Sequence, residues 1–402
     1  MSWNSVKLGE LYTVHNGLSK GSKFFGNGYP FLTFSTVFNN YFIPPELDSF
    51  VQSSEAERQN YSIKRGDVFV TRTSETSDEL GMSCVALKDY PNATYNGFTK
   101  RMRPFTDRIL PEFIGYYMRM PSFRGAFLAF STMTTRASLK NEDLLGLQIR
   151  LPEKETQKRI ADILSAYDNL IENNQKQIKL LEEAARRLYK EWFVNFRFPR
   201  YEDTPIVDGV PEGWEKAPID SRISLLSGYA FKSAQFDNSG EYKIVTIKNV
   251  KDGEFDGINT NRIVSIPGKM PKHCVLTDGD ILLSLTGNVG RTCIVNGNNY
   301  LLNQRVAKLQ SDIPAFTYCL FRSSDMFDAM NNLANGAAQQ NLSPIRTGKI
   351  SILFPADNLL EEFERIVGSM ISKMLSLIKQ CDLLIQSRDR LLPKLMSGEI
   401  EV

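Results

Sequence analysis

Hydrophobic positions recur in alternating steps of four and three residues over two long stretches of the chain, Ile160 to Trp192 and Phe363 to Leu395. A narrow apolar stripe with a period of 3.5 residues is typical of a coiled coil, whereas a helix lying on a globular core shows a wider stripe at 3.6. Each stretch covers about 33 residues, or roughly 50 Å of helix. We therefore predict two long helices of matched length that bury their stripes against each other, rather than two unrelated amphipathic helices.

The predicted seams contain two polar members among otherwise apolar residues. The first seam is Ile160, Leu164, Tyr167, Ile171, Asn174, Ile178, Leu181, Ala185, Leu188 and Trp192, and the second is Phe363, Val367, Met370, Met374, Leu377, Cys381, Leu384, Arg388, Leu391 and Leu395. We expect Asn174 to set the register of the pair, as polar seam residues do in coiled coils. Arg388 has two interpretations, a register-setting residue or a residue at a frayed, solvated helix end.

Short apolar or alternating runs bounded by turn residues predict a strand-rich domain before the first long helix, with strands at Tyr29 to Phe34 and Asp67 to Thr71. A helix is expected from Pro111 to Met120, with Pro121 closing it. The first long helix is expected to begin near Lys154 and to end near Phe196, because a run of prolines follows.

After these prolines, the pattern of the first half of the chain is repeated. Trp214 corresponds to Trp3, Gly279-Asp280 before an apolar run corresponds to Gly66-Asp67, and a second long helix follows Pro355 as the first follows Pro152. The chain is therefore predicted to contain two copies of one unit, a domain followed by a long helix. The predicted segments are a first domain at 1–152, a first helix at 153–197, a linker at 198–217, a second domain at 218–355 and a second helix at 356–402.

The predicted fold class is α+β: two tandem mixed α/β domains and two long helices that pair as an antiparallel coiled coil with a pseudo-two-fold axis. Antiparallel pairing would put the two domains at opposite ends of a rod, with centres separated by at most roughly 15 base pairs of DNA. Parallel pairing would put both domains at one end, and the linker would then have to cross the rod.

Composition and charge exclude few classes of function. The net charge is +2, so no global field selects a partner and any nucleic-acid surface must be local. The chain has five isolated cysteines, no signal-like N-terminus and no apolar run of membrane-spanning length. These features predict a cytoplasmic protein with reduced thiols.

A search for catalytic motifs finds none. The chain has two histidines, His15 and His273, without a second ligand at metal spacing. The glycine-rich stretch from Gly287 to Thr292 lacks the lysine of a phosphate loop. Asp67 and Asp280 each lead directly into a strand, which favours turn residues over paired catalytic carboxylates. The sequence therefore predicts a protein that is not an enzyme and binds no metal or cofactor itself.

The remaining chemistry is that of binding. Arginines and lysines are interleaved with aromatic residues between Thr94 and Arg136, and the second domain is rich in amides. Arginine fits phosphate oxygens or the guanine edge, and Asn and Gln fit adenine. A solvated charged face would explain any single residue equally well, but the placement of the set in two repeated domains favours DNA reading.

The chain resembles the specificity subunit of a type I restriction and modification enzyme. The resemblance rests on Leu151-Pro152 leading into the first helix, on Trp192-Phe193, on the segment from Asp208 to Trp214, and on the terminal segment from Leu391 to Ile400. It covers essentially the whole chain. The order of two domains and two helices is specific, whereas the recognition domains of this family vary freely.

The resemblance implies a non-catalytic subunit in which two target-recognition domains each read half of a bipartite sequence in double-stranded DNA. The helix pair would set the gap and dock two methyltransferase subunits, which would bind S-adenosylmethionine. ATP would be used by separate restriction subunits, whose presence the sequence leaves open. Trp192 and Phe193 would be docking points for the partners or, equally, core residues.

By the same analogy, we expect readout in loops of both domains. The expected DNA-binding residues are Lys20, Lys23, Arg72, Thr73, Lys100, Arg101, Arg103, Thr135 and Arg136 in the first domain, and Lys232, Lys248, Asn249, Asn288, Arg291, Asn303, Gln304, Arg305, Gln339, Gln340 and Asn341 in the second. Two alternatives remain: a non-catalytic scaffold whose coiled coil joins two protein-binding domains, and a stand-alone nuclease or methyltransferase, which the missing motifs disfavour.

Overall fold

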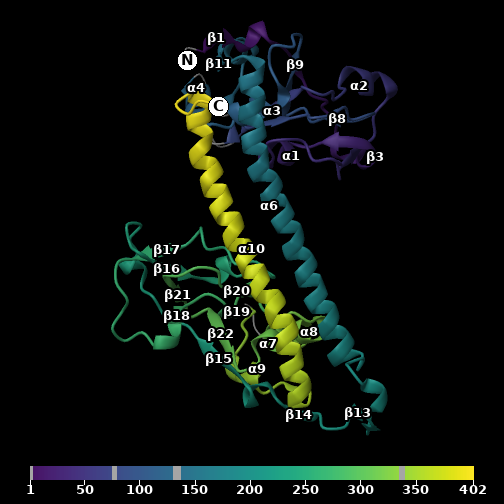
Figure 1. Cartoon of the computed structure of the whole chain (residues 1–402), viewed down its shortest axis with the longest axis vertical. Coiled ribbons are helices and arrows are strands. Elements are labelled where there is room, and N and C mark those ends of the chain that lie inside the picture. Colours follow the sequence, from purple (N-terminus) through teal and green to yellow (C-terminus); the bar gives the residue numbers. More distant parts are fainter. Residues whose placement is uncertain (1–2, 75–78, 130–136, 335–339) are drawn as a thin grey trace. The chain divides into compact units, whose positions relative to one another are not determined.

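The computed structural model describes residues 3–74, 79–129, 137–334 and 340–402. The chain divides into two compact units: unit 1 is Met1–Leu170 with Leu384–Val402, and unit 2 is Ile171–Leu383. The long helices α6 (Lys154–Tyr189) and α10 (Asp357–Ser397) each contribute residues to both units (Figure 1). Each unit therefore contains the start of one long helix and the end of the other.

Unit 1 is a mixed α/β unit. Its strands are β1 (Asn4–Lys7), β2 (Tyr12–Asn16), β3 (Phe25–Leu32), β4 (Phe50–Val51), β5 (Val68–Thr71), β6 (Thr73–Ser74), β7 (Ser83–Val85), β8 (Thr94–Tyr95), β9 (Thr99–Pro104), β10 (Ala137–Ser138) and β11 (Gln148–Leu151). Its short helices are α1 (Phe34–Asn39), α2 (Glu55–Asn60), α3 (Pro111–Tyr117), α4 (Pro121–Ala129) and α5 (Asn141–Gly146). The main sheet has the order β2-β9-β5-β7, with all neighbouring pairs antiparallel.

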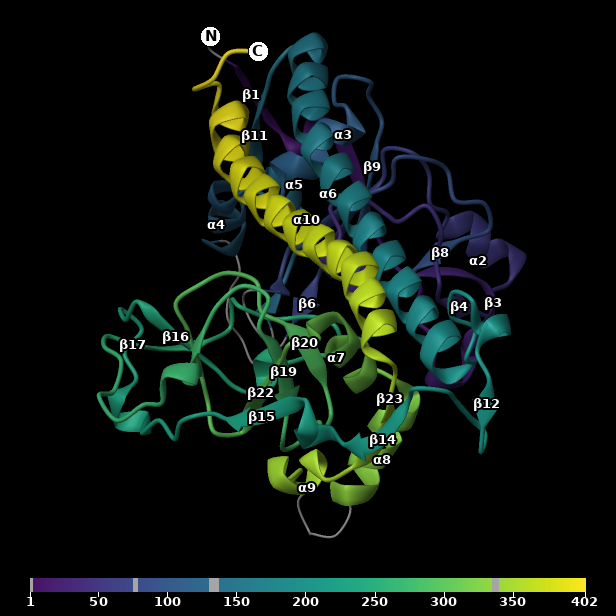
Figure 2. The same ribbon diagram turned by 60° about the horizontal axis from the view of Figure 1, so that its bottom comes forward.

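Unit 2 repeats this plan. Its strands are β12 (Ile206–Val207), β13 (Val210–Pro211), β14 (Glu215–Pro218), β15 (Ile223–Ser227), β16 (Tyr242–Val245), β17 (Asn261–Ile263), β18 (Val275–Leu276), β19 (Ile281–Ser284), β20 (Thr292–Ile294), β21 (Tyr300–Leu302), β22 (Val306–Ser311) and β23 (Ser351–Phe354). Its short helices are α7 (Pro314–Phe321), α8 (Ser324–Ala334) and α9 (Pro344–Gly348). The four-stranded sheet β15-β22-β19-β20 packs against a second four-stranded sheet, β17-β16-β21-β18 (Figure 2).

Backbone hydrogen bonds confirm the internal repeat at the level of single residues. The Leu18 amide donates to the Tyr95 carbonyl at 2.9 Å, and the Tyr229 amide donates to the Leu302 carbonyl at 2.9 Å. Further along, the Leu139 amide donates to the Arg72 carbonyl at 3.1 Å, and the Leu342 amide donates to the Leu285 carbonyl at 2.7 Å. Two different sequences therefore build the same crossing of chain segments.

Helix ends complete each core. The core of unit 1 contains Ile160 and Leu164 from the start of α6 together with Leu392 and Leu395 from the end of α10. The core of unit 2 contains Trp192 and Phe193, which follow α6, together with Phe363 and Val367 from the start of α10. Burying an aliphatic or aromatic side chain contributes about 1.5–3 kcal/mol, so these contacts anchor both helices firmly.

The helices run antiparallel, as predicted. Within unit 2, the Asn174 amide donates to Gln380 Oε1 at 3.2 Å, whereas Tyr189, further along α6, packs its ring against Phe363, which lies earlier in α10. All residues of the two predicted seams are buried or partly buried. The coiled-coil prediction is therefore confirmed.

Arg388 does not lie at a solvated helix end. Its side chain is 14% exposed, and its Nη1 donates to Asp168 Oδ1 at 2.6 Å within unit 1. The same carboxylate accepts the Tyr116 hydroxyl at 2.6 Å, and the guanidinium lies over the Tyr41 ring. The polar seam residue is thus one member of a cluster of charged and aromatic groups.

Several predicted boundaries differ from the structure. The strand predicted from Tyr29 to Phe34 ends at Leu32, because the Thr33 hydroxyl accepts the Thr36 amide and caps α1. Pro121 begins α4 as well as following α3. The α-helical part of the first long helix ends at Tyr189, and a π-helical turn, Lys190–Val194, follows it.

The predicted linker at 198–217 is more ordered than its prolines suggest. Phe198 is buried, and the Trp214 ring contacts Phe193, Phe196 and Phe198 at centroid distances of 5.3–6.0 Å. Strand β14 pairs with β23 as β1 pairs with β11, so its residues belong to the second repeat. Burial of the aromatic side chains in this segment is favourable in free energy. It fixes the backbone, which the prolines alone would leave extended.

Candidate nucleic-acid interface

Polar chain segments lie along one edge of the main sheet of unit 1, the row where strands β2 and β5 end and strand β9 begins. Asn16 at the end of β2 pairs with Lys100, and Thr71 at the end of β5 pairs with Thr99, so these strand ends lie in one row. The chain enters or leaves the sheet here at 17–20, 72 and 96–98, and the Leu139 amide, from the segment before α5, donates to the Arg72 carbonyl at 3.1 Å. The crossing is close: a Cβ on Gly17 would lie 2.0 Å from the Asn96 carbonyl oxygen, so only glycine fits without a shift.

A cavity of about 420 Å³ opens at this edge. It is lined by Asn16, Arg72, Lys100, Leu139, Lys140, Asn141 and Glu142. Lys100 is 6% exposed, and its ammonium donates a hydrogen bond to Asn141 Oδ1. Burial, together with the nearby Arg72 charge, lowers the pKa of Lys100. Glu142 also lines the cavity, but within the described residues neither Lys100 nor Arg72 forms an ion pair with a carboxylate.

Arg101 and Arg103 point away from this edge, although both were expected to bind DNA. Successive side chains of β9 alternate between the two faces of the sheet, so the face of Lys100 cannot also carry Arg101 and Arg103. Arg101 Nη1 donates to the Ser62 carbonyl at 2.8 Å. Arg103 donates two hydrogen bonds, of 2.7 and 2.6 Å, to the buried Asp67 carboxylate.

Lys20 and Lys23 lie on the 17–24 segment but differ in what they contact. The Lys20 ammonium forms a 2.8 Å ion pair with Glu57, donates to the Gln52 carbonyl and lies near the Phe24 ring. Lys23 also lies near that ring. Hydrogen bonding to Lys20 lowers the pKa of Glu57, so the carboxylate stays ionised beside the ammonium. The Lys20 charge is therefore largely satisfied within the domain.

Unit 2 presents an equivalent edge with different chemistry. The Asn303 Oδ1 accepts the Arg305 amide at 3.2 Å, which shapes the turn at 303–305, and Gln304 and Arg305 are exposed. Asn341 forms an isolated bridge with Thr286, and Asn288 is exposed in the adjoining loop. Gln340 is exposed next to them. These amides and Arg305 provide the donors and acceptors that base edges require.

Three other predicted residues of unit 2 vary in accessibility. Lys232 and Lys248 are exposed. Asn249 is 1% exposed, and its side chain is fully engaged with the Thr246 amide and the Asp256 carbonyl, both at 2.8 Å. Asn249 therefore holds the loop together rather than facing solvent.

Arg291 lies in the loop after Gly290, within 4.0 Å of Asp252 and over the Phe327 ring. Thr73 contributes its backbone to β6, which pairs with β10. Thr135, Arg136 and Gln339 lie outside the described residues. Sequence reasoning missed Asn16, Lys140 and Asn141, which line the cavity. Their signal in the sequence is their position at the end of strand β2 and at the start of helix α5.

Asp67 and Asp280 have the turn role that was predicted and an ion pair that was not. Asp67 Oδ2 accepts the Lys64 amide at 2.7 Å, and Asp280 Oδ2 accepts the Thr277 amide at 2.8 Å. Asp280 also pairs with Lys308 at 2.7 Å, as Asp67 does with Arg103. The two carboxylates are thus held by cations on the neighbouring strand in both repeats.

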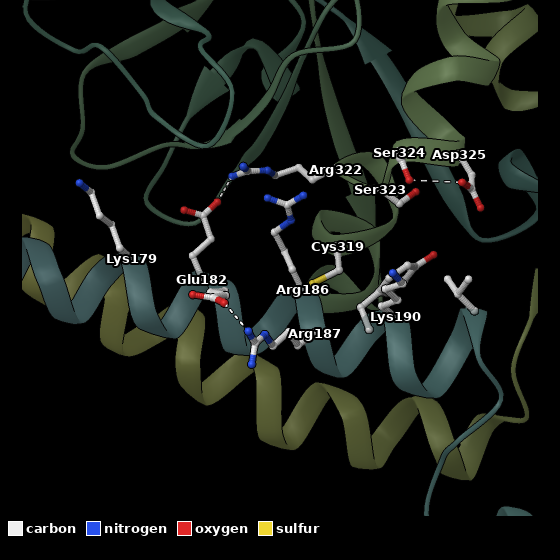
Figure 3. A pocket seen from close by; sticks show the side chains of 13 residues that line it. Lys179, Glu182, Arg186, Arg187, Lys190, Cys319, Arg322, Ser323, Ser324 and Asp325 are labelled. Carbon is white, nitrogen blue, oxygen red and sulfur yellow. Dashed lines mark hydrogen bonds and ion pairs between the residues drawn. The ribbon is translucent and has the colours of Figure 1, made fainter. Parts of the chain in front are cut away.

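A larger cavity, of about 720 Å³, lies in unit 2 beside the end of α6 (Figure 3). Lys179 and Arg186 on α6 and Lys190 on the π-helical turn after it are exposed along one wall, and none of them forms an ion pair with any residue the structure describes. Glu182 pairs with Arg322 on the opposite wall, and Glu183 pairs with Arg187 on the helix surface. This wall therefore carries unneutralised positive charge.

Trp192 and Phe193 are core residues, with exposures of 6% and 8%. Both rings contact Phe363.

Over the described ranges, no group of three or more His, Cys, Asp or Glu side chains could hold a metal ion. In the same ranges, no helix is both long and apolar enough to cross a membrane. All five cysteines are buried and free.

Known proteins share this architecture over the whole chain. A family model described as the type I restriction modification DNA specificity domain matches residues 1–183 and 211–368, one match for each repeat. The chain therefore belongs to the type I restriction modification DNA specificity family and is a specificity subunit of a type I restriction-modification system.

Individual relatives agree along nearly their full length. The type I restriction enzyme MjaIX specificity subunit of Methanocaldococcus jannaschii is 24% identical, covering 100% of this chain and 94% of its own. The HindI specificity subunit of Haemophilus influenzae is 22% identical, covering 99% of each. The crystal structure of the type I S subunit from M. genitalium matches with a TM-score of 0.60 at 14% identity, covering 98% of this chain and 96% of that one. The fold is therefore shared.

Proposed function

We propose that this subunit reads a bipartite sequence in double-stranded DNA, with one half-site for each recognition domain. The observation that carries the proposal is the repeated sheet edge, which presents exposed amides and arginine in unit 2 and a cation-lined cavity in unit 1. Cations and amides are the groups that read phosphates and base edges. Because the two edges differ in residue content, the two half-sites differ in sequence.

The helix pair, in this proposal, sets the gap between half-sites and docks two methyltransferase subunits. The subunit itself is not catalytic, since S-adenosylmethionine binds to the methyltransferase subunits and ATP to restriction subunits where these are present. The free charges of Lys179, Arg186 and Lys190 beside the unit 2 cavity favour contact with an acidic surface of a partner. Arg186→Glu should then weaken retention of the methyltransferase on the tagged chain, whereas Arg365→Glu, an exposed change on α10, should not.

The experiment that tests DNA reading is selection from random DNA. The chain is co-purified with its methyltransferase, incubated with a randomised duplex library, and the bound fraction is sequenced at several salt concentrations. Enrichment of two short half-sites at a fixed spacing supports the proposal. Binding without enrichment, or no salt-dependent binding, would favour the scaffold alternative.

Arg305 offers a residue-level test of the second reader. It is exposed on the turn at 303–305. Arg305→Ala should weaken binding to the selected target by about 1–3 kcal/mol and relax one base position if the guanidinium contacts a base. An unchanged ratio between target and random DNA would remove Arg305 from the reading surface.

A further inference from the structure

The cavity of unit 1 is lined by two neighbouring cations, Lys100 and Arg72, that form no ion pair with any residue the structure describes. Lys100 is almost fully buried, yet its hydrogen-bond acceptor is the neutral Asn141 amide. Arg72 lines the same cavity, and its Nε is buried without a hydrogen-bond partner. In the described part of the chain no carboxylate forms an ion pair with either cation, and Glu142, which also lines the cavity, is exposed.

Such an arrangement is unfavourable in the absence of a ligand. Burying a cation without a counter-charge costs free energy, and two neighbouring cations also repel each other. A neutral base edge would add acceptors but would leave both charges uncompensated. A backbone phosphate carries one negative charge and acceptor oxygens that both groups can reach, so it would balance one of the two charges and accept hydrogen bonds from both cations.

The equivalent edge of unit 2 lacks this arrangement. Matching the strand pairing of the two repeats places Ala307 at the position of Lys100 and Leu285 at the position of Arg72. Ser227 corresponds to Asn16. The cation pair is therefore not a requirement of the fold, which is built equally well with apolar residues.

We propose that the cavity lined by Arg72, Lys100 and Asn141 is a binding site for one phosphate of the DNA backbone, present in the first recognition domain and absent from the second. This inference rests on the proposed DNA reading and adds to it how the first domain is held on the duplex. The phosphate contact positions the domain, while neighbouring loops read the bases.

The test uses the complex of the full chain with its methyltransferase subunits and measures DNA affinity as a function of salt. Lys100→Met replaces the cation by an apolar side chain of similar length. We expect affinity for target and random DNA to fall by a similar factor, about tenfold. The slope of log affinity against log salt should shrink by about 0.9, the loss of one phosphate contact. Lys7→Met, which removes an exposed lysine on β1, is the matched control and should change neither quantity.

A second variant supplies an anion to the cavity instead of removing a cation from it. Asn141→Asp places a carboxylate beside the Lys100 ammonium and so supplies the missing anion from within. We expect this variant to bind DNA at least as weakly as Lys100→Met. Both variants should melt at the same temperature as the parent or higher, because each relieves an unbalanced buried charge.

The outcomes separate the site from the proposed function. If Lys100→Met keeps the parent affinity and slope while the complex still selects its target, the phosphate site is wrong and DNA reading stands. If only target binding falls and one base position is relaxed, Lys100 contacts a base and not a phosphate. A complex that selects no sequence even with the parent chain would overturn the proposed function itself. A large drop in melting temperature with unchanged DNA affinity would make Lys100 a structural residue.

Discussion

The cluster around Arg388 allows the stability of one helix end to be predicted from its contacts. Arg388 Nη1 and the Tyr116 hydroxyl each donate to the Asp168 carboxylate at 2.6 Å. The side chains of Arg388 and Asp168 are 14% and 28% exposed, so the pair is neither fully buried nor freely solvated. Arg388→Met removes the cation and leaves the carboxylate facing a tyrosine whose pKa burial has already raised.

The magnitude follows from the degree of burial. Removing one partner of a fully buried ion pair costs about 3–5 kcal/mol, and exposed pairs contribute about 0–1 kcal/mol. For this partly buried pair we expect a loss of about 2 kcal/mol. In a unit of this size that corresponds to a fall of roughly 4–8 °C in the melting temperature.

Calorimetry of the full chain checks this value, with Arg390→Met as control because Arg390 is an exposed arginine two residues further along α10. The control should shift the melting temperature by less than about 2 °C. Equal shifts for the two variants would refute the reasoning. The double variant Asp168→Leu with Arg388→Met should recover much of the loss, because the equivalent positions of unit 2 hold the apolar residues Ile371 and Ala185.

Three further predictions concern other parts of the fold. Asn174→Leu should raise the free energy of unfolding by about 1 kcal/mol while loosening the preferred gap between half-sites, as seen by thermal melting and by target selection; unchanged stability and gap would contradict its register role. Gly17→Ala should cost about 1–3 kcal/mol because its Cβ would meet the Asn96 carbonyl, whereas Gly21→Ala, with open space around it, should be nearly neutral in the same melting assay. Burial raises the pKa of Glu364, so the folded state binds this proton more tightly than the unfolded chain does. The stability that this group contributes therefore falls as pH rises from the unfolded pKa, about 4, through the higher folded one. Glu364→Gln should flatten that fall in melting curves recorded from about pH 4 upward, and an unaltered pH profile would contradict it.

Periodicity predicted the two helices and their pairing, because a seam of apolar residues at steps of four and three has few ways to be buried. The antiparallel direction followed from the linker, which parallel pairing would have forced across the rod. The internal repeat was also readable, since Trp214 and Gly279-Asp280 recur at nearly the same spacing as Trp3 and Gly66-Asp67, and the corresponding segments form the same backbone hydrogen bonds. These features depend on local sequence and on its repetition.

The candidate site was less predictable, because side-chain direction depends on tertiary pairing. Lys100, Arg101 and Arg103 lie within four positions, yet strand alternation sends Lys100 to the cavity and the two arginines to Ser62 and Asp67. A composition count cannot separate them. The order of the predicted linker was missed for a related reason, since its prolines were visible but the aromatic partners of Trp214 were not assembled until the fold was known.

The most direct test of the central claim is a map of modified adenines. The chain is co-expressed with its methyltransferase partner in a host lacking other adenine methylation, and the genome is read by single-molecule sequencing. Two recognition domains reading one duplex predict a split motif, with two short half-sites separated by a fixed unspecified gap. Methylation at a continuous motif, or none in a complex that assembles, would contradict bipartite reading.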